Sequence, residues 1–139
     1  MIVIFDCNVL LSAFISRGST ADKCWEKSKK SDVIVASQQT FDEFNSVFLR
    51  TKFDRYLTLE SRLELILEVQ TLTKIIPVRH TVTICRDPKD NQYLELAITG
   101  KADCIVSGDP DLQILNPFEN IPIISPREFL DRFHPETGI

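Results

Sequence analysis

Short apolar runs alternate with amphipathic segments along the whole chain. Runs with the length of buried strands occupy residues 2–5, 33–36, 75–78, 102–106 and 121–124. Between them, apolar residues at helical spacing and capping residues predict helices over residues 9–15, 21–30, 38–49, 59–74, 91–99, 109–115 and 127–133. Strands separated by helices indicate the α/β class, with a mainly parallel sheet that carries helices on both faces.

Several single residues refine these boundaries. Thr20 and Ser37 have the side-chain chemistry of helix N-caps, and Gly100 fits the left-handed position that ends a helix. In the long helix over residues 59–74, a mixed but mostly one-sided apolar stripe is formed by Leu63, Ile66, Leu67 and Val69–Gln70.

Composition limits the protein to a few classes. The 139 residues predict one domain over residues 1–133 and a frayed tail over residues 134–139. The net charge of −4 means that a nucleic-acid partner would need a local basic face. No apolar run reaches the roughly 20 residues of a membrane span, and the N-terminus does not resemble a secretion signal. Four cysteines without a C-x-x-C pair favour reduced thiols in a cytoplasmic protein over a zinc site.

Acidic residues recur where predicted strands end and helices begin. Asp6 and Asp109 follow two strands, Glu43 lies in the helix after the second strand, and Asp90 starts the helix before the fourth. Because the carboxyl ends of parallel strands share one edge of a sheet, these four acids can face one site. Asp87 and Asp111 are further acids beside this set.

Four clustered carboxylates need charge compensation. Two like charges about 4 Å apart repel by roughly 4 kcal/mol near a protein surface. Six such pairs would rival a domain's total stability of roughly 5–15 kcal/mol. The acids must therefore be partly protonated, lie further apart, or hold a cation. Oxygen ligands without His or Cys select Mg²⁺ or Mn²⁺, and Asn8 and Ser107 could orient an acid or a metal-bound water.

Four segments resemble the PIN domain, specifically the toxin components of prokaryotic toxin–antitoxin systems. The segments are IVIFDCNVLLSAF, SQQTFDEFNSVFLRTKF, RDPKDNQYLELAITGKADCIVSGDPDLQIL and IPIISPREFL. The resemblance implies a Rossmann-like three-layer α/β/α fold and a ribonuclease that depends on Mg²⁺ or Mn²⁺. It places the family's acidic quartet on Asp6, Glu43, Asp90 and Asp109, its Ser/Thr position on Ser107, and accessory positions on Asn8 and Asp111. Family members often form homodimers and are often inhibited by a small antitoxin.

Each acid also has a purely structural interpretation. Asp6 and Asp109 could be turn residues, Asp90 could be an N-cap, and Glu43 could be solvated. Asp87 beside Pro88 favours a turn. Their joint placement, together with the resemblance, favours the shared site.

Basic residues near the acids are candidate RNA contacts. Arg50 and Lys52 follow the helix of Glu43, and Arg86 and Lys89 adjoin Asp90. Cys7 lies between Asp6 and Asn8, and we expect its side chain to turn into the core.

The clustered acids predict metal-assisted hydrolysis of phosphodiesters, leaving 5′-phosphate and 3′-hydroxyl ends, and the resemblance implies that the substrate is RNA. An aspartyl-phosphate phosphatase is one alternative, but that chemistry needs an acid two residues after the nucleophile, where this chain has Asn8. A non-catalytic, metal-stabilised binding module is another.

Overall fold

A computed structural model of the protein, which describes residues 1–135, contains one five-stranded sheet. The strands are β1 (Ile2–Phe5), β2 (Val33–Ala36), β3 (Thr73–Ile75), β4 (Cys104–Val106) and β5 (Ile123–Ile124). Their order is β3-β2-β1-β4-β5, and every neighbouring pair is parallel. The predicted α/β class with a mainly parallel sheet is confirmed.

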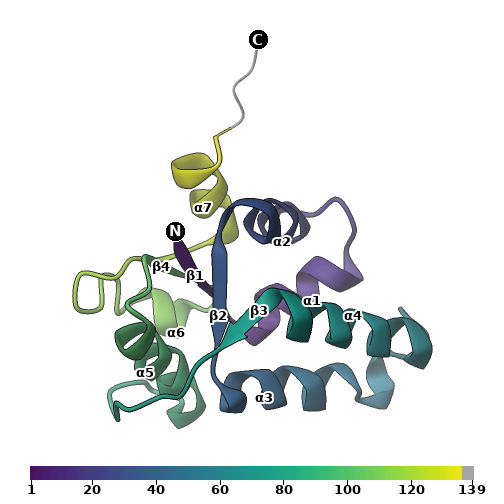
Figure 1. Cartoon of the computed structure of the whole chain (residues 1–139), viewed down its shortest axis with the longest axis horizontal. Coiled ribbons are helices and arrows are strands. Elements are labelled where there is room, and N and C mark those ends of the chain that lie inside the picture. The colour runs from purple at the N-terminus through teal and green to yellow at the C-terminus, as the bar shows by residue number, and fades with distance from the viewer. Residues whose placement is uncertain (136–139) are drawn as a thin grey trace.

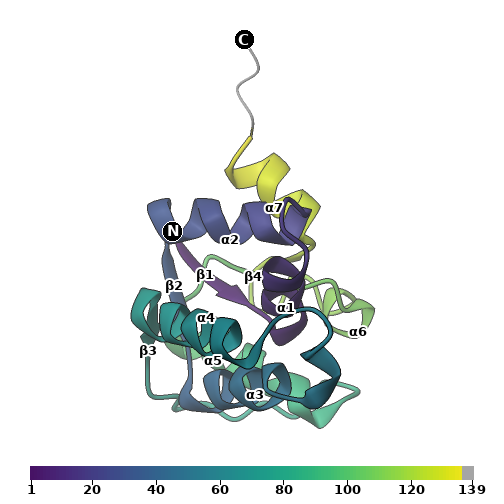
Figure 2. The same cartoon turned by 90° about the vertical axis from the view of Figure 1, so that its right-hand side faces the viewer.

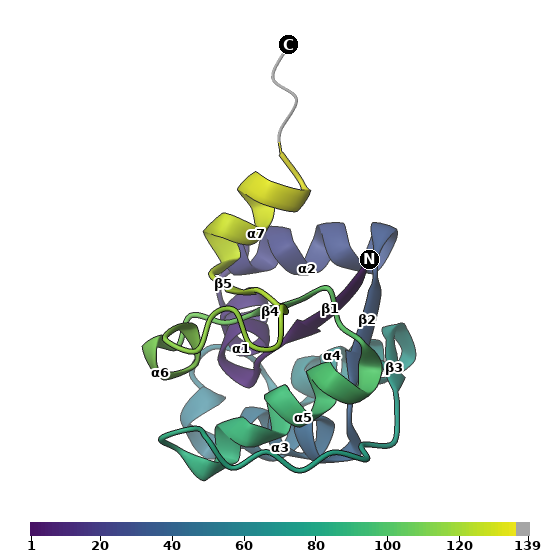
Figure 3. The same ribbon diagram turned by 90° about the vertical axis from the view of Figure 1, so that its left-hand side faces the viewer.

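Seven α-helices and two short 3₁₀ helices connect the described strands. They are α1 (Cys7–Ile15), α2 (Thr20–Ser31), α3 (Gln38–Phe48), η1 (Thr51–Phe53), α4 (Leu59–Leu72), η2 (Pro88–Asp90), α5 (Asn91–Gly100), α6 (Pro110–Gln113) and α7 (Pro126–Phe133). Helices α1, α2 and α4 lie on one side of the sheet and α5 and α6 on the other (Figures 1 and 3). The result is the three-layer α/β/α arrangement.

The central strand β1 separates two apolar clusters because successive side chains of a strand point to opposite faces. Val3 and Phe5 enter the cluster under α1, α2 and α7, whereas Ile4 enters the cluster under α5. Phe5 makes edge-to-face contacts with Trp25 and Phe129, with ring centroids 6.2 and 6.1 Å apart. These contacts join β1 to α2 and α7, which lie side by side in Figure 2.

Helix α4 departs from its prediction at its end and on its exposed face. It ends at Leu72, because Thr73 and Lys74 pair with Ile34 and Val35 in the sheet. Of the predicted apolar stripe, Leu63 and Leu67 are 50% and 61% exposed, whereas Val69 is buried and Ile66 packs partly buried against the main apolar cluster. The stripe therefore matches the packing face only in part. The buried residues of α4 are Arg62 and Val69, which lie about two turns apart. Helical spacing identified an apolar stripe but not which stripe faces the core.

Two predicted capping positions shift by one residue. Ser19, not Thr20, caps α2 by accepting a hydrogen bond from Asp22 N at 3.2 Å. The left-handed residue after α5 is Lys101, with φ of 50°, and Gly100 is the last helical residue. A Cβ on Gly100 would lie 2.9 Å from Ile76 Cδ1, so a larger residue there would displace the end of the Ile76 side chain.

The described chain ends just after α7. His134 Nε2 lies 2.9 Å from Asp32 Oδ2, and residues 136–139 of the predicted tail lie outside the described residues. Within residues 1–135, no helix has the length and apolar character needed to cross a membrane. The four cysteines are free thiols.

Candidate active site

The four predicted acids line one hollow of about 300 Å³ at the carboxyl ends of the strands. Asp6 follows β1 directly and Asp109 lies three residues after the end of β4, the strand paired with β1. Glu43 reaches the same hollow from α3, and Asp90 from the junction of η2 and α5. The structure therefore brings together all four acids of the predicted quartet.

Asp6 is buried, with only 4% of its surface exposed. It caps α1 by accepting a hydrogen bond from Val9 N at 2.8 Å, and it also accepts one from Ser107 Oγ. Burial raises the pKa of Asp6 from 3.8 to about 6, against the opposing effect of these two hydrogen bonds and with a smaller rise from Asp109 and Glu43. The fold thus holds a carboxyl group where its ionised form is disfavoured.

Ser107 connects the ends of β1 and β4. Its buried hydroxyl donates to Asp6 Oδ2 and accepts from Asp109 N at 3.0 Å. Asp109 in turn caps α6 by accepting from Asp111 N at 2.9 Å. One small side chain therefore fixes the positions of two of the four acids.

Glu43 is held by two neighbours on α5 that the sequence analysis did not identify. Tyr93 Oη donates to Glu43 Oε1 at 2.9 Å, and Gln92 Nε2 donates to Glu43 Oε2 at 2.9 Å. Tyr93 follows Asp90 by three residues and so lies on the same face of this helical segment. The spacing of three residues from Asp90 could have indicated a site residue, but the same spacing is equally typical of a residue that packs in the core.

Asp90 makes no capping hydrogen bond to its helix, so its placement is not explained by the N-cap alternative. Burial, followed by repulsion from Asp109 and then Asp87, raises the pKa of Asp90 from 3.8 to about 7. Asp87 caps η2 by accepting from Lys89 N at 3.0 Å and also lines the hollow. Asp87 therefore has the turn role that its position beside Pro88 favoured.

Not every predicted accessory residue reaches the hollow. Asn8 and three of the four basic candidates, Arg50, Lys52 and Lys89, line it. Arg86 and Asp111 do not, and their side chains face one another with Arg86 Nη1 3.9 Å from Asp111 Oδ1. The Asp111 side chain therefore does not line the hollow, although its backbone N–H donates to Asp109.

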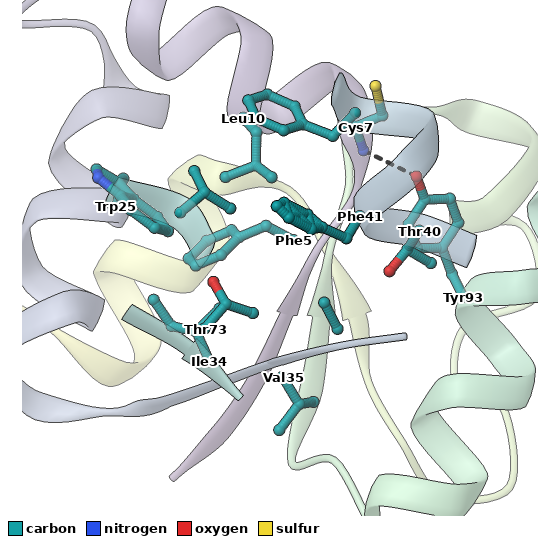
Figure 4. A pocket seen from close by; sticks show the side chains of 13 residues that line it. Phe5, Cys7, Leu10, Trp25, Ile34, Val35, Thr40, Phe41, Thr73 and Tyr93 are labelled. Carbon is teal, nitrogen blue, oxygen red and sulfur yellow. Dashed lines mark hydrogen bonds between the residues drawn. The ribbon is translucent and has the colours of Figure 1, made fainter. Parts of the chain in front are cut away.

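Cys7 lies between the hollow and the interior. Its half-buried side chain contacts the main apolar cluster, lines the hollow, and also lines a small internal void beneath α1 (Figure 4). Burial, together with the charges of Glu43 and Asp6, raises the pKa of the Cys7 thiol to about 12. In the metal-free protein the Cys7 thiol is therefore neutral and packs against the main apolar cluster.

The acids suit a hard divalent cation in chemistry and charge. Among residues 1–135, no three His, Cys, Asp or Glu side chains are close enough together to form a ready-made metal site. The four acids nonetheless share one hollow, offer only oxygen donors, and include two whose ionised forms are disfavoured there. Mg²⁺ and Mn²⁺ prefer such oxygen ligands, and a bound cation would favour the ionised carboxylates.

Comparison with known proteins identifies the family. An uncharacterized protein of Methanocaldococcus jannaschii, MJ1680, is 28% identical over 142 residues, which cover 94% of this chain and 90% of the relative. A chain in the crystal structure of VapBC2 from Rickettsia felis, bound to a DNA fragment from their promoter, has a TM-score of 0.60 and 17% identity, and the match covers 90% of this chain and 98% of that one. Residues 2–111 match the PIN domain, and the chain belongs to the PIN domain family.

Proposed function

We propose that the protein is a metal-dependent ribonuclease that hydrolyses RNA phosphodiester bonds. The observation that carries this proposal is the convergence of Asp6, Glu43, Asp90 and Asp109 on one hollow. PIN domains are generally nucleases, and the full acidic quartet is present in this chain. Membership of the PIN domain family supports a hydrolase that acts on nucleic acid. The choice of RNA as substrate and of the metal is part of the proposal.

Mg²⁺ or Mn²⁺ would be held by the four acids, directly or through water. The ion would lower the pKa of a bound water and stabilise the charge that develops on the phosphate, giving 5′-phosphate and 3′-hydroxyl ends. The protein's own contribution is to fix the acids: Ser107 orients Asp6 and the Asp109 backbone, and the caps of α1 and α6 hold both carboxylates at the strand ends.

Basic side chains at the rim support a nucleic-acid substrate. Arg50 and Lys52 lie on one side of the hollow, at η1 and the residue before it, and Lys89 lies on η2. Because the whole chain carries a net charge of −4, these local cations are needed to hold an RNA backbone next to the acids. Binding is therefore expected to weaken as salt concentration rises.

The phosphatase alternative lacks its general acid. Asn8 lines the hollow at the position where a second carboxyl group would be required, and an amide cannot donate and recover a proton in its place. The binding-module alternative differs only in lacking turnover, so the cleavage assay decides it.

We infer in addition a small antitoxin partner, a homodimeric assembly and a cytoplasmic location. The similar chain in the Rickettsia felis structure belongs to a VapBC2 assembly, which supports a protein partner. Exposed leucines on α4, Leu59, Leu63 and Leu67, supply an apolar surface of the kind that interfaces cover. Light scattering of the purified protein tests the dimer, and growth arrest on induced expression tests the toxin role.

Cleavage of RNA by the purified protein tests the proposal. Wild type should cleave with Mn²⁺ and not with EDTA, and Asp109→Asn should lose on the order of 100-fold or more in rate. Asp131→Asn, which removes an exposed acid on α7, is the matched control and should cleave as wild type does. Equal cleavage under all conditions and by all variants would reveal a contaminating nuclease and leave the proposal without support.

A further inference from the structure

The buried hydroxyl of Tyr93 joins three elements around the hollow. Tyr93 lies on α5 and is only 3% exposed. Its hydroxyl lies 2.9 Å from Glu43 Oε1 on α3 and 3.0 Å from Cys7 N, the first residue of α1 (Figure 4 shows the bond to Cys7). Cys7 directly follows Asp6, so this one oxygen connects the surroundings of two proposed metal ligands.

Donor and acceptor roles in this network are fixed by chemistry. The Cys7 N–H belongs to the first turn of α1, where amides have no partner within the helix, and it can only donate. Tyr93 Oη therefore accepts from Cys7, and its single proton is directed to Glu43. Burial raises the pKa of Tyr93 well above its ordinary value, so the hydroxyl keeps that proton.

Glu43 depends on hydrogen bonds from neighbouring side chains more than Asp6 and Asp109 do. Asp6 and Asp109 are short side chains that cap the helices following β1 and β4. Glu43 is a longer side chain in the interior of α3, with one more rotatable bond and no capping role. Tyr93 and Gln92 each hold one of its two carboxylate oxygens. Both donors lie on α5, the helix that also follows Asp90.

We propose that Tyr93 is a positioning residue, which sets the orientation of the Glu43 carboxylate relative to Asp6. This inference rests on the proposed function, because it assigns Tyr93 a role in building that metal site. Residues that orient a metal ligand through a hydrogen bond affect metal affinity or activity by roughly 10–100-fold when changed. Tyr93 is almost fully buried and its hydroxyl is engaged by Glu43 and Cys7, so we expect the effect to fall on kcat and metal affinity more than on KM for RNA.

Tyr93→Phe removes the hydroxyl and keeps the ring. We expect its Mn²⁺ affinity, measured by electron paramagnetic resonance of free Mn²⁺, to fall by about 10-fold, with a similar loss in kcat. Tyr56→Phe is a matched control, because the chain has only these two tyrosines and Tyr56 is exposed. A melting temperature lowered by roughly 5 °C would reflect the unpaired Cys7 amide and would not by itself support positioning.

A double-mutant cycle separates positioning from general loosening of the fold. In a Glu43→Gln background, Tyr93→Phe should cause little further loss of Mn²⁺ affinity, because the carboxylate it orients is already gone. An equal loss in both backgrounds would overturn the inference, as would unchanged affinity and kcat in Tyr93→Phe. If those results came with Mn²⁺-dependent cleavage that Asp109→Asn abolishes, the proposed function would stand without the Tyr93 role. Wild type that neither binds Mn²⁺ nor cleaves RNA would overturn both.

Discussion

Replacing Asp6 with asparagine should stabilise the metal-free protein at neutral pH. Asp6 is almost fully buried, and its pKa rises from 3.8 to about 6 on folding, chiefly because burial disfavours the charged form. At about 1.36 kcal/mol per pKa unit, this difference corresponds to roughly 3 kcal/mol of folding free energy. Asparagine keeps the oxygen that accepts from Val9 N and carries no charge to desolvate.

The sign of the pH dependence follows from the raised pKa. Well below the unfolded pKa of 3.8 the carboxyl is protonated in both the folded and the unfolded state. Between pH 4 and 6 the unfolded chain loses this proton first, so the free energy of unfolding falls as pH rises, and it levels off above the folded pKa. Asp90 adds a loss of the same sign that extends to about pH 7, but it is more exposed and contributes less.

Urea unfolding in EDTA at pH 4 and pH 8, followed by fluorescence of the single tryptophan, measures this effect. Trp25 is buried and reports the main core. Relative to wild type, Asp6→Asn should gain roughly 3 kcal/mol between the two pH values. Asp131→Asn removes an exposed negative charge and serves as the control for net charge. A difference between wild type and Asp6→Asn that stays constant with pH, or that changes in the opposite direction, would refute the assignment of a disfavoured charge to Asp6.

Three further predictions concern the metal and the packing of α4. Mn²⁺ at 100 times its Kd for wild type should raise the free energy of unfolding of wild type by about 2.7 kcal/mol and that of Asp6→Asn by clearly less. If Mn²⁺ raised the melting temperatures of both proteins equally, Asp6 would not be a ligand. Leu63→Ser, at an exposed position, should change the free energy of unfolding by less than about 0.5 kcal/mol, whereas Val69→Ala, at a buried one, should lower it by about 1–3 kcal/mol. Urea unfolding measures both, and similar costs would mean that α4 packs through its leucines. Arg62→Met should lower the free energy of unfolding by about 3 kcal/mol or more. The Arg62 side chain is 1% exposed, and its guanidinium donates to Phe48 O at 2.9 Å, to Arg50 O at 3.2 Å and to Asp54. A stability equal to that of Arg55→Met would refute this role.

The sequence predicts β1 and β2 well because strands buried on both faces leave a simple signal, whereas the predicted extended run over residues 75–78 overlaps β3 only at Ile75. Residues 2–5 and 33–36 are continuous apolar runs, and the structure places β1 and β2 over the same residues. Helix α4 is harder, because its apolar residues occupy more than one stripe. Val69 of the predicted stripe is buried, but so is Arg62, which the pattern did not indicate. The burial of Arg62 depends on carbonyl groups of the α3–η1 turn that no local pattern reveals. Tertiary contacts decide which stripe is buried.

The acids of the site are predictable for a related reason. An acid directly after a buried strand lies at the sheet's carboxyl edge whatever the details of packing, so Asp6 and Asp109 could be placed before the structure was known. Tyr93 and Gln92 could not, because an aromatic residue and an amide in an amphipathic helix are typical of ordinary packing. Their role depends on the distance between α5 and Glu43, which only the fold determines.

Ser107 combines a feature that the sequence shows with a contact that only the fold determines. Its position two residues before Asp109 can be read in the sequence, but its donation to Asp6 depends on the pairing of β4 with β1. The hydroxyl favours an ionised Asp6, and burial of the same carboxyl opposes ionisation more strongly. The metal-free fold is therefore destabilised at neutral pH by the group that a cation would use. A divalent ion would remove this penalty on binding, so we expect metal affinity and metal-free stability to change in opposite directions when Asp6 is replaced.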